Sequence, residues 1–196
     1  GKSPMIEYLI RLLLKEYSLA TLSRGYRRKT KGFLLANKET NALDIGDEPF
    51  QFYNKFGSEI YVAVDEERKR GIMELQRLVS PEVVLLDDAF QHRKVTAGFY
   101  VLLTTYNDPF VNDFILPAGN LRESRSGAKR ADVVVVTKCP DDLSESSINE
   151  LKRKIASYTG ANVPVVFSKI SYASAVVNED VTMPLEEIRT KFTLVT

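Results

Sequence analysis

The chain has 196 residues, of which 44% are hydrophobic and 27% are charged, a composition typical of a globular protein with one substantial core. Its formal net charge of +1 argues against a nucleic-acid-binding protein, whose surface would be strongly basic. Cys139 is the only cysteine and His92 the only histidine, which excludes a disulfide framework and favours a reducing compartment. No apolar run reaches the roughly 20 residues that a membrane-spanning helix needs.

The chain opens on Gly1-Lys2-Ser3, and an apolar helical pattern follows at once over residues 3–16. This tripeptide is the end of the phosphate-binding pattern G-x-x-x-x-G-K-[ST]. In such a loop the glycine lets the backbone approach the phosphates, the lysine neutralises charge, and the hydroxyl binds Mg²⁺. The helix that follows directs its N-terminus at the anion. Because so short a motif also occurs by chance, an ordinary helix start is the alternative.

Short apolar runs alternate with helical patterns along the rest of the chain, which is typical of a parallel sheet covered by helices. Several runs are continuously apolar, as expected of strands that are buried on both faces. Strands are predicted at 19–23, 60–64, 83–87, 99–104, 133–137 and 163–168, with candidate further strands at 33–37 and 193–196, and helices at 49–56, 66–78 and 144–158. We interpret residues 1–196 as one P-loop NTPase-like α/β domain, with a mainly parallel sheet and helices on both faces, that lacks its first strand and a C-terminal lobe.

A second phosphate-site signal lies at residues 82–88, where an apolar strand ends in two acids, Asp87 and Asp88. This is the Walker-B pattern, in which a strand-end carboxylate holds the metal ion of P-loop enzymes. Asp87 fits the strand end, and Asp88 is a candidate catalytic residue nearer the nucleophile, but the pattern leaves open which of them binds the metal. A helix cap is the structural alternative.

Polar segments follow several predicted strands, at the edge of the sheet where ligands of this fold class bind. They are Ser23-Arg24-Gly25-Tyr26, Gly46-Asp47-Glu48-Pro49, Leu86-Asp87-Asp88-Ala89-Phe90-Gln91-His92 and Leu116-Pro117-Ala118-Gly119-Asn120-Leu121-Arg122-Glu123. Together with Gly1-Lys2-Ser3-Pro4 and Thr137-Lys138-Cys139-Pro140, these segments resemble the tetraacyldisaccharide 4'-kinase family, also called lipid A 4'-kinase. The resemblance covers residues 1 to about 140 in matching order, and Ala89 with residues 137–140 looks like the Bacteroidetes branch.

The resemblance implies an enzyme of lipid A (lipopolysaccharide) biosynthesis in a Gram-negative bacterium. Such kinases use ATP and Mg²⁺ to phosphorylate the 4'-hydroxyl of an acylated glucosamine disaccharide 1-phosphate. A lipid acceptor implies work at the cytoplasmic face of the inner membrane. The amphipathic or spanning segment that commonly anchors such enzymes would precede Gly1.

The phosphate side of the expected site uses the first residues of the chain. Lys2 and the backbone amides of Gly1–Ser3 would cradle the ATP phosphates. Mg²⁺ prefers hard oxygen ligands, which Ser3 and Asp87 would supply, with Glu48 as a further metal or water ligand.

The acceptor side is expected to use a base and several cationic or polar groups. By resemblance the base is Asp47, whose histidine partner belongs to a downstream Asp-His-His motif that this chain does not contain. The alternative for Asp47 is a loop acid that caps the helix predicted from Pro49. Arg24 and Arg122 would bind the lipid phosphate or ATP. Gln91 and His92 are further substrate-binding candidates, and for His92 a structural role is equally expected.

Two residues depart from the family pattern: Arg27 stands where Ser-Arg-Gly-Tyr-Gly-Arg usually has glycine, and Ser124 replaces a frequent proline. The resemblance therefore does not predict the conformations of these two loops.

Two alternative classes of function remain. One alternative class is a P-loop GTPase or ATPase of the metallochaperone type, but such proteins carry several Cys and His ligands. The other is a nucleotide-binding fragment that does not turn over. We expect the full-length parent to phosphorylate the disaccharide and this segment alone to be inactive.

Overall fold

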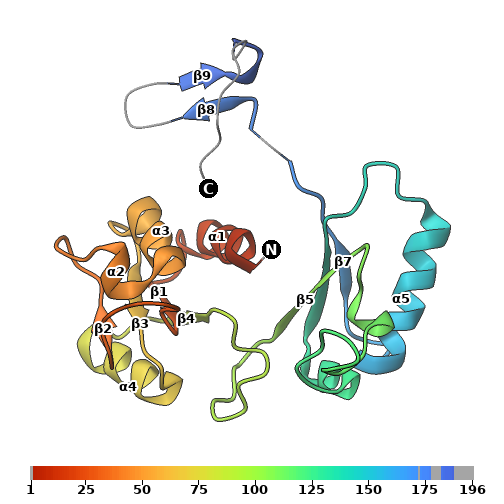
Figure 1. The fold of residues 1–196 in the computed structure, drawn as a ribbon, viewed down its shortest axis with the longest axis horizontal. Coiled ribbons are helices and arrows are strands. Elements are labelled where there is room, and N and C mark those ends of the chain that lie inside the picture. The colour runs from red at the N-terminus through yellow and green to blue at the C-terminus, as the bar shows by residue number, and fades with distance from the viewer. Residues whose placement is uncertain (1, 172, 178–181, 188–196) are drawn as a thin grey trace.

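The computed structural model describes residues 2–171, 173–177 and 182–187 (Figure 1). The first sheet has the strand order β2-β3-β1-β4. Its strands are β1 (Leu19–Ser23), β2 (Leu34–Leu35), β3 (Tyr61–Val64) and β4 (Val83–Leu86). β1 lies between β3 and β4 and is parallel to both, whereas β2 is an antiparallel edge strand on β3. All five residues of β1 are buried, as its continuous apolar pattern predicts.

Helices cover both faces of this sheet (Figure 1). α1 (Lys2–Leu13), α2 (Ala42–Ile45) and α3 (Asp47–Phe56) pack on one face, and α4 (Arg68–Leu78) packs on the other. Ile10 and Phe52 are fully buried in the first core, and Leu75 is fully buried in the second. Leu19 packs in the first core and the next residue, Ala20, packs in the second, because successive side chains of a strand point to opposite faces of the sheet.

The second sheet contains β5 (Val101–Thr105), β6 (Val133–Thr137) and β7 (Val165–Phe167), all parallel and in that order. α5 (Glu145–Thr159) and the short 3₁₀ helix η1 (Phe110–Asn112) contribute to a core on one face, and a second 3₁₀ helix, η2 (Arg125–Arg130), contacts α5. α5 begins where the Ser144 hydroxyl accepts a hydrogen bond from the Ser147 amide, and it ends at Gly160, as its sequence predicts. A two-stranded antiparallel ribbon follows, β8 (Ala175–Val177) with β9 (Thr182–Pro184), and then η3 (Leu185–Glu187).

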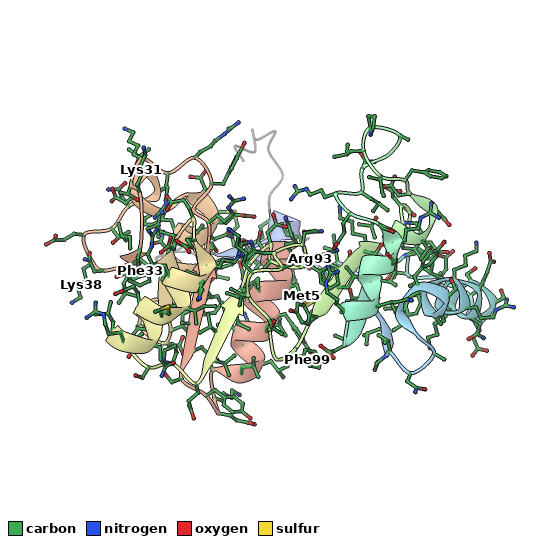
Figure 2. The ribbon with its side chains drawn as sticks, turned by 90° about the horizontal axis from the view of Figure 1, so that it is seen from below. Met5, Lys31, Phe33, Lys38, Arg93 and Phe99 are labelled. Carbon is green, nitrogen blue, oxygen red and sulfur yellow. The ribbon has the colours of Figure 1, made fainter. Side chains whose placement is uncertain are left out.

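The predicted parallel α/β class is confirmed, and six strands and four helices lie where the pattern places them. Within the described residues β4 and β5 do not pair with each other, and the parallel strands lie in two separate sheets. Arg93 and Phe99 belong to the irregular segment that joins these strands, and they lie between the two halves in the view of Figure 2. A pattern of apolar residues predicts where strands lie along the chain, but it does not predict which strands pair with each other. Residues 193–196, a candidate strand, lie outside the described residues.

Two local features differ from expectation. α3 begins at Asp47 and not at Pro49, directly after Gly46, whose φ of 92° and ψ of 160° turn the chain into the helix. α2 was not predicted, because its four residues are too short for a periodic pattern; Asn41 and Asp44 form its capping box. In the part of the chain that the structure describes, no helix combines the length and the hydropathy that a membrane crossing requires.

Candidate functional site

The N-terminus of α1 carries two of the predicted phosphate-binding side chains. Lys2 is the first residue of the helix, and its Nζ lies 2.7 Å from Oδ1 of Asp88. The Ser3 hydroxyl donates a hydrogen bond of 2.6 Å to Oε1 of Glu48, in the first turn of α3. Two helix N-termini and the tip of β4 are therefore joined by side-chain contacts. Gly1 lies outside the described residues.

The tip of β4 is held in an unusual backbone conformation. Asp88 has a φ of 48°, in the left-handed region that aspartate tolerates better than most residues. The guanidinium of Arg68, a residue that is 2% exposed, donates to the carbonyl oxygens of Asp87 at 2.6 Å and Asp88 at 3.1 Å. Arg68 thus braces the turn that presents both carboxylates. This role was not predictable from the sequence, because Arg68 lies within the charged run at 65–70.

The two strand-tip carboxyl groups have opposite pKa shifts. Burial, and then the negative charge of Glu48, raise the pKa of Asp87, and the charge of Lys2 offsets only part of this. Burial also raises the pKa of Asp88, but the hydrogen bond and charge of Lys2, with the charge of Arg122, outweigh it and bring that pKa below its usual value. Asp88 is therefore held ionised by cations, whereas the negative charge of Asp87 is poorly compensated.

The structure brings most of the remaining candidates near this strand tip. Arg122 Nη1 lies 3.4 Å from Oδ2 of Asp88, and Gln91 lines a small cavity together with Arg122. Burial, followed by the positive charges of Arg68 and Arg24, lowers the pKa of His92, which places all three within electrostatic range of one another. These residues come from three separate loops, as expected for ligands at the carboxyl edge of a parallel sheet.

Asp47 is the candidate with the fewest contacts. It is exposed in the first turn of α3, next to Glu48, and no ion pair within the described residues includes it. Its position beside Glu48, which itself contacts Ser3, keeps it close to the phosphate-binding end of α1. The structure thus neither pairs Asp47 with another catalytic side chain nor removes it from the site.

The basic residues near Arg122 in the chain, Arg125 and Arg130, have structural partners. The Glu123 carboxylate accepts from Arg130 at 2.6 Å and from Arg93 at 3.2 Å, and Arg130 also donates to the Phe90 carbonyl. Arg125 donates to the Asp113 carbonyl. Among these basic residues, Arg122 is the one whose guanidinium reaches the strand tip.

A cavity of about 340 Å³ lies beside Lys2 and the carboxyl ends of β5 and β6. Its wall includes Thr104, Thr105, Thr137 and Asp113. This volume is within the range of small-ligand sites. A helix N-terminus, a lysine and threonine hydroxyls around one cavity can bind a phosphate anion.

The fold, with a lysine at the start of α1 facing the aspartate at the tip of β4, defines a protein of the P-loop class. Within that class the chain belongs to the tetraacyldisaccharide-1-P 4'-kinase family, whose model matches residues 1–189. The resemblance found in the sequence is thereby confirmed.

Curated relatives support the same family. The chain is 56% identical over 191 residues to the tetraacyldisaccharide 4'-kinase of Flavobacterium psychrophilum. The aligned region covers 97% of this chain and 55% of the relative. The chain is 53% identical to the protein of that name from Flavobacterium johnsoniae, covering 97% of this chain and 56% of the relative. For Bacteroides fragilis strain YCH46 the identity is 53%, over 79% of this chain and 42% of the relative. The chain spans about half the length of these relatives.

A solved structure has the same fold. LpxK from Aquifex aeolicus, crystallised in complex with ATP, superposes with a TM-score of 0.63 at 28% sequence identity. The match covers 92% of this chain and 71% of that one.

Proposed function

We propose that the full-length protein to which this segment belongs transfers the γ-phosphate of ATP to the 4'-hydroxyl of a tetraacyldisaccharide 1-phosphate, in lipid A biosynthesis. The observation that carries the proposal is the 2.7 Å contact of Lys2 with Asp88 at the N-terminus of α1, in a chain of the 4'-kinase family. The contact joins the phosphate-binding lysine to the strand-tip acid. Both groups are needed where phosphoryl charge is neutralised.

Lys2 and the N-terminus of α1 would bind the β- and γ-phosphates of ATP. The side chains of Ser3, Glu48 and Asp87 offer the hard oxygen atoms that Mg²⁺ prefers, and the Ser3 hydroxyl and the Glu48 carboxylate are already in contact at 2.6 Å. Mg²⁺, when bound, supplies charge neutralisation at the phosphates. In the described ranges no three acidic, His or Cys side chains surround one metal position.

On the acceptor side, Asp47 would accept the proton of the 4'-hydroxyl as its oxygen attacks the γ-phosphorus and ADP leaves. The new bond joins the sugar oxygen to phosphorus, and the broken bond joins phosphorus to the β–γ bridging oxygen. Arg24, Arg122, Gln91 and His92 would contact the sugar or its phosphate. A lipid acceptor places this reaction at the cytoplasmic face of the inner membrane.

A phosphotransfer assay with labelled ATP and the purified disaccharide tests the proposal. We expect label transfer by the full-length kinase, none by residues 1–196 alone, and a loss of at least 100-fold for Lys2→Ala, because phosphate stabilisation of this kind contributes on the order of several kcal/mol. Lys15→Ala is the matched control, since Lys15 is an exposed lysine beyond the other end of α1. A full-length protein without transfer activity, or an active Lys2→Ala variant, would contradict the proposal.

A further inference from the structure

The segment that follows β1, residues 24–32, is closed on itself by one arginine. The Arg28 side chain is only 2% exposed, and its Nη2 donates to the Gly32 carbonyl and to Oε1 of Glu66, each at 2.6 Å. The second oxygen of Glu66 accepts the Gly32 amide at 3.0 Å. Arg28, Gly32 and Glu66 therefore form a closed ring of charge-assisted hydrogen bonds, which are the stronger kind.

Glu66 is itself positioned by the end of the first sheet. It lies two residues beyond the end of β3, and the intervening Asp65 is fully buried and accepts two hydrogen bonds from Arg70, at 2.6 and 2.8 Å. Arg70 also approaches Glu66 at 3.6 Å. The carboxylate that receives Arg28 thus belongs to a rigid part of the molecule, so the ring ties the loop to the sheet.

The same loop rests on the residues that precede α3. The Lys29 amide donates to the Leu43 carbonyl at 2.8 Å, and the Thr30 hydroxyl donates to the Asp44 carbonyl. A side-chain carbon added to Gly46 would lie 2.9 Å from the Tyr26 carbonyl oxygen, so loop and helix start are in direct contact. The residue after Gly46 is Asp47. Lys31 and Phe33, at the end of this loop, lie on the side of the molecule away from the second sheet (Figure 2).

We propose that the Arg28–Glu66 pair is a positioning device for the acceptor side of the reaction: it fixes loop 24–32, and through that loop the orientation of Asp47 and Arg24. Within the described residues the Arg28 side chain donates hydrogen bonds to Thr30, Gly32 and Glu66 and to neither the strand tip nor the start of α1, so Arg28 is a positioning residue and not a catalytic one. The role assigned to Asp47 and Arg24 rests on the proposed function; the mechanical link between the two segments does not.

The first test separates nucleotide binding from transfer in the full-length kinase. For Arg28→Lys and Glu66→Gln we expect ADP affinity within about twofold of wild type, because Lys2 and Ser3 are untouched. Transfer should fall on the order of 10- to 100-fold in kcat, since a misplacement near 1 Å has that effect. Glu74→Gln is the matched control: it breaks the exposed Glu74–Arg77 pair on α4, at 2.7 Å, and should change neither quantity. Unchanged transfer in both loop variants, or equal losses of ADP affinity and transfer, would overturn the proposal.

The second test does not depend on measuring phosphate transfer. Hydrogen–deuterium exchange of the same full-length variants should accelerate in residues 24–32 and also in residues 41–47, while α5 stays as protected as in wild type. Acceleration confined to 24–32 would show that the loop does not hold the start of α3, and would refute the link. If Arg28→Lys does not fold, Glu66→Gln gives the same readout, because it removes one charge and keeps the shape. If the wild type transfers no phosphate but exchange responds as expected, the proposed function fails and the link stands.

Discussion

Gly46→Ala perturbs the junction on which the acceptor side depends. The φ of 92° and ψ of 160° at Gly46 lie in a region that is essentially restricted to glycine, and occupying it with another residue costs about 1–3 kcal/mol. The added carbon would also meet the Tyr26 carbonyl oxygen at 2.9 Å and the backbone of Gly25 at 3.4 Å, so that part of the loop must shift. Together we expect a loss of about 3 kcal/mol of unfolding free energy, at the upper end of that range.

For a chain of this size, 1 kcal/mol corresponds to about 2–4 °C in melting temperature. The relatives are nearly twice as long as this chain and the shift per kcal/mol falls as the chain lengthens, so we expect the purified full-length Gly46→Ala protein to melt roughly 3–6 °C below wild type in a thermal denaturation experiment. Gly98→Ala is the control, because a side-chain carbon there meets nothing within 4 Å, and it should leave the melting temperature nearly unchanged. A Gly46→Ala protein that melts within about 2 °C of wild type would refute the strain argument.

Three further perturbations follow from the structure. Phe52→Ala removes a fully buried side chain of the first core and should lower the unfolding free energy by about 3–5 kcal/mol, whereas Met73→Ala, at a position 62% exposed, should change it by less than about 0.5 kcal/mol in denaturant titrations; equal effects would contradict the assigned burial. Arg68→Met leaves the two strand-tip carbonyls without their donor, so we expect about 1–3 kcal/mol of destabilisation together with weaker ADP binding, and unchanged binding would show that the turn needs no brace. Partial burial raises the pKa of Glu66, but hydrogen bonds from its own backbone and from Arg28 outweigh this, and the pKa is lowered. A lowered pKa means that the stabilisation is present above the unfolded value of about 4.3 and is lost as the pH falls through the folded value. The difference in stability between wild type and Glu66→Gln, at most about 1 kcal/mol for a half-exposed carboxylate, should thus be present at pH 7 and absent near pH 3; a difference that persists at pH 3 would exclude this linkage.

Local sequence was sufficient for the secondary structure because strands and helices depend on short-range periodicity. The continuous apolar run at 19–23 and the amphipathic run at 144–158 became β1 and α5 with little change in their bounds. The order of the short polar motifs was also sufficient for the family, whose model matches residues 1–189. The contacts between those motifs were not predictable. The sequence predicts that Asp88 follows a strand, but its ion pairs with Lys2 and Arg122 join three segments that are distant along the chain.

The sequence by itself determined the parallel α/β class, the helix that begins at Lys2 and the acids that follow β4, because each of these depends on neighbours within a few residues. Tertiary structure alone decided that the side chains of Arg68 and Arg28 are buried and that Glu66 closes the loop at residues 24–32. In the sequence these charged residues look like solvated surface. Their burial depends on carbonyl and carboxylate partners that only the folded chain brings within hydrogen-bonding distance.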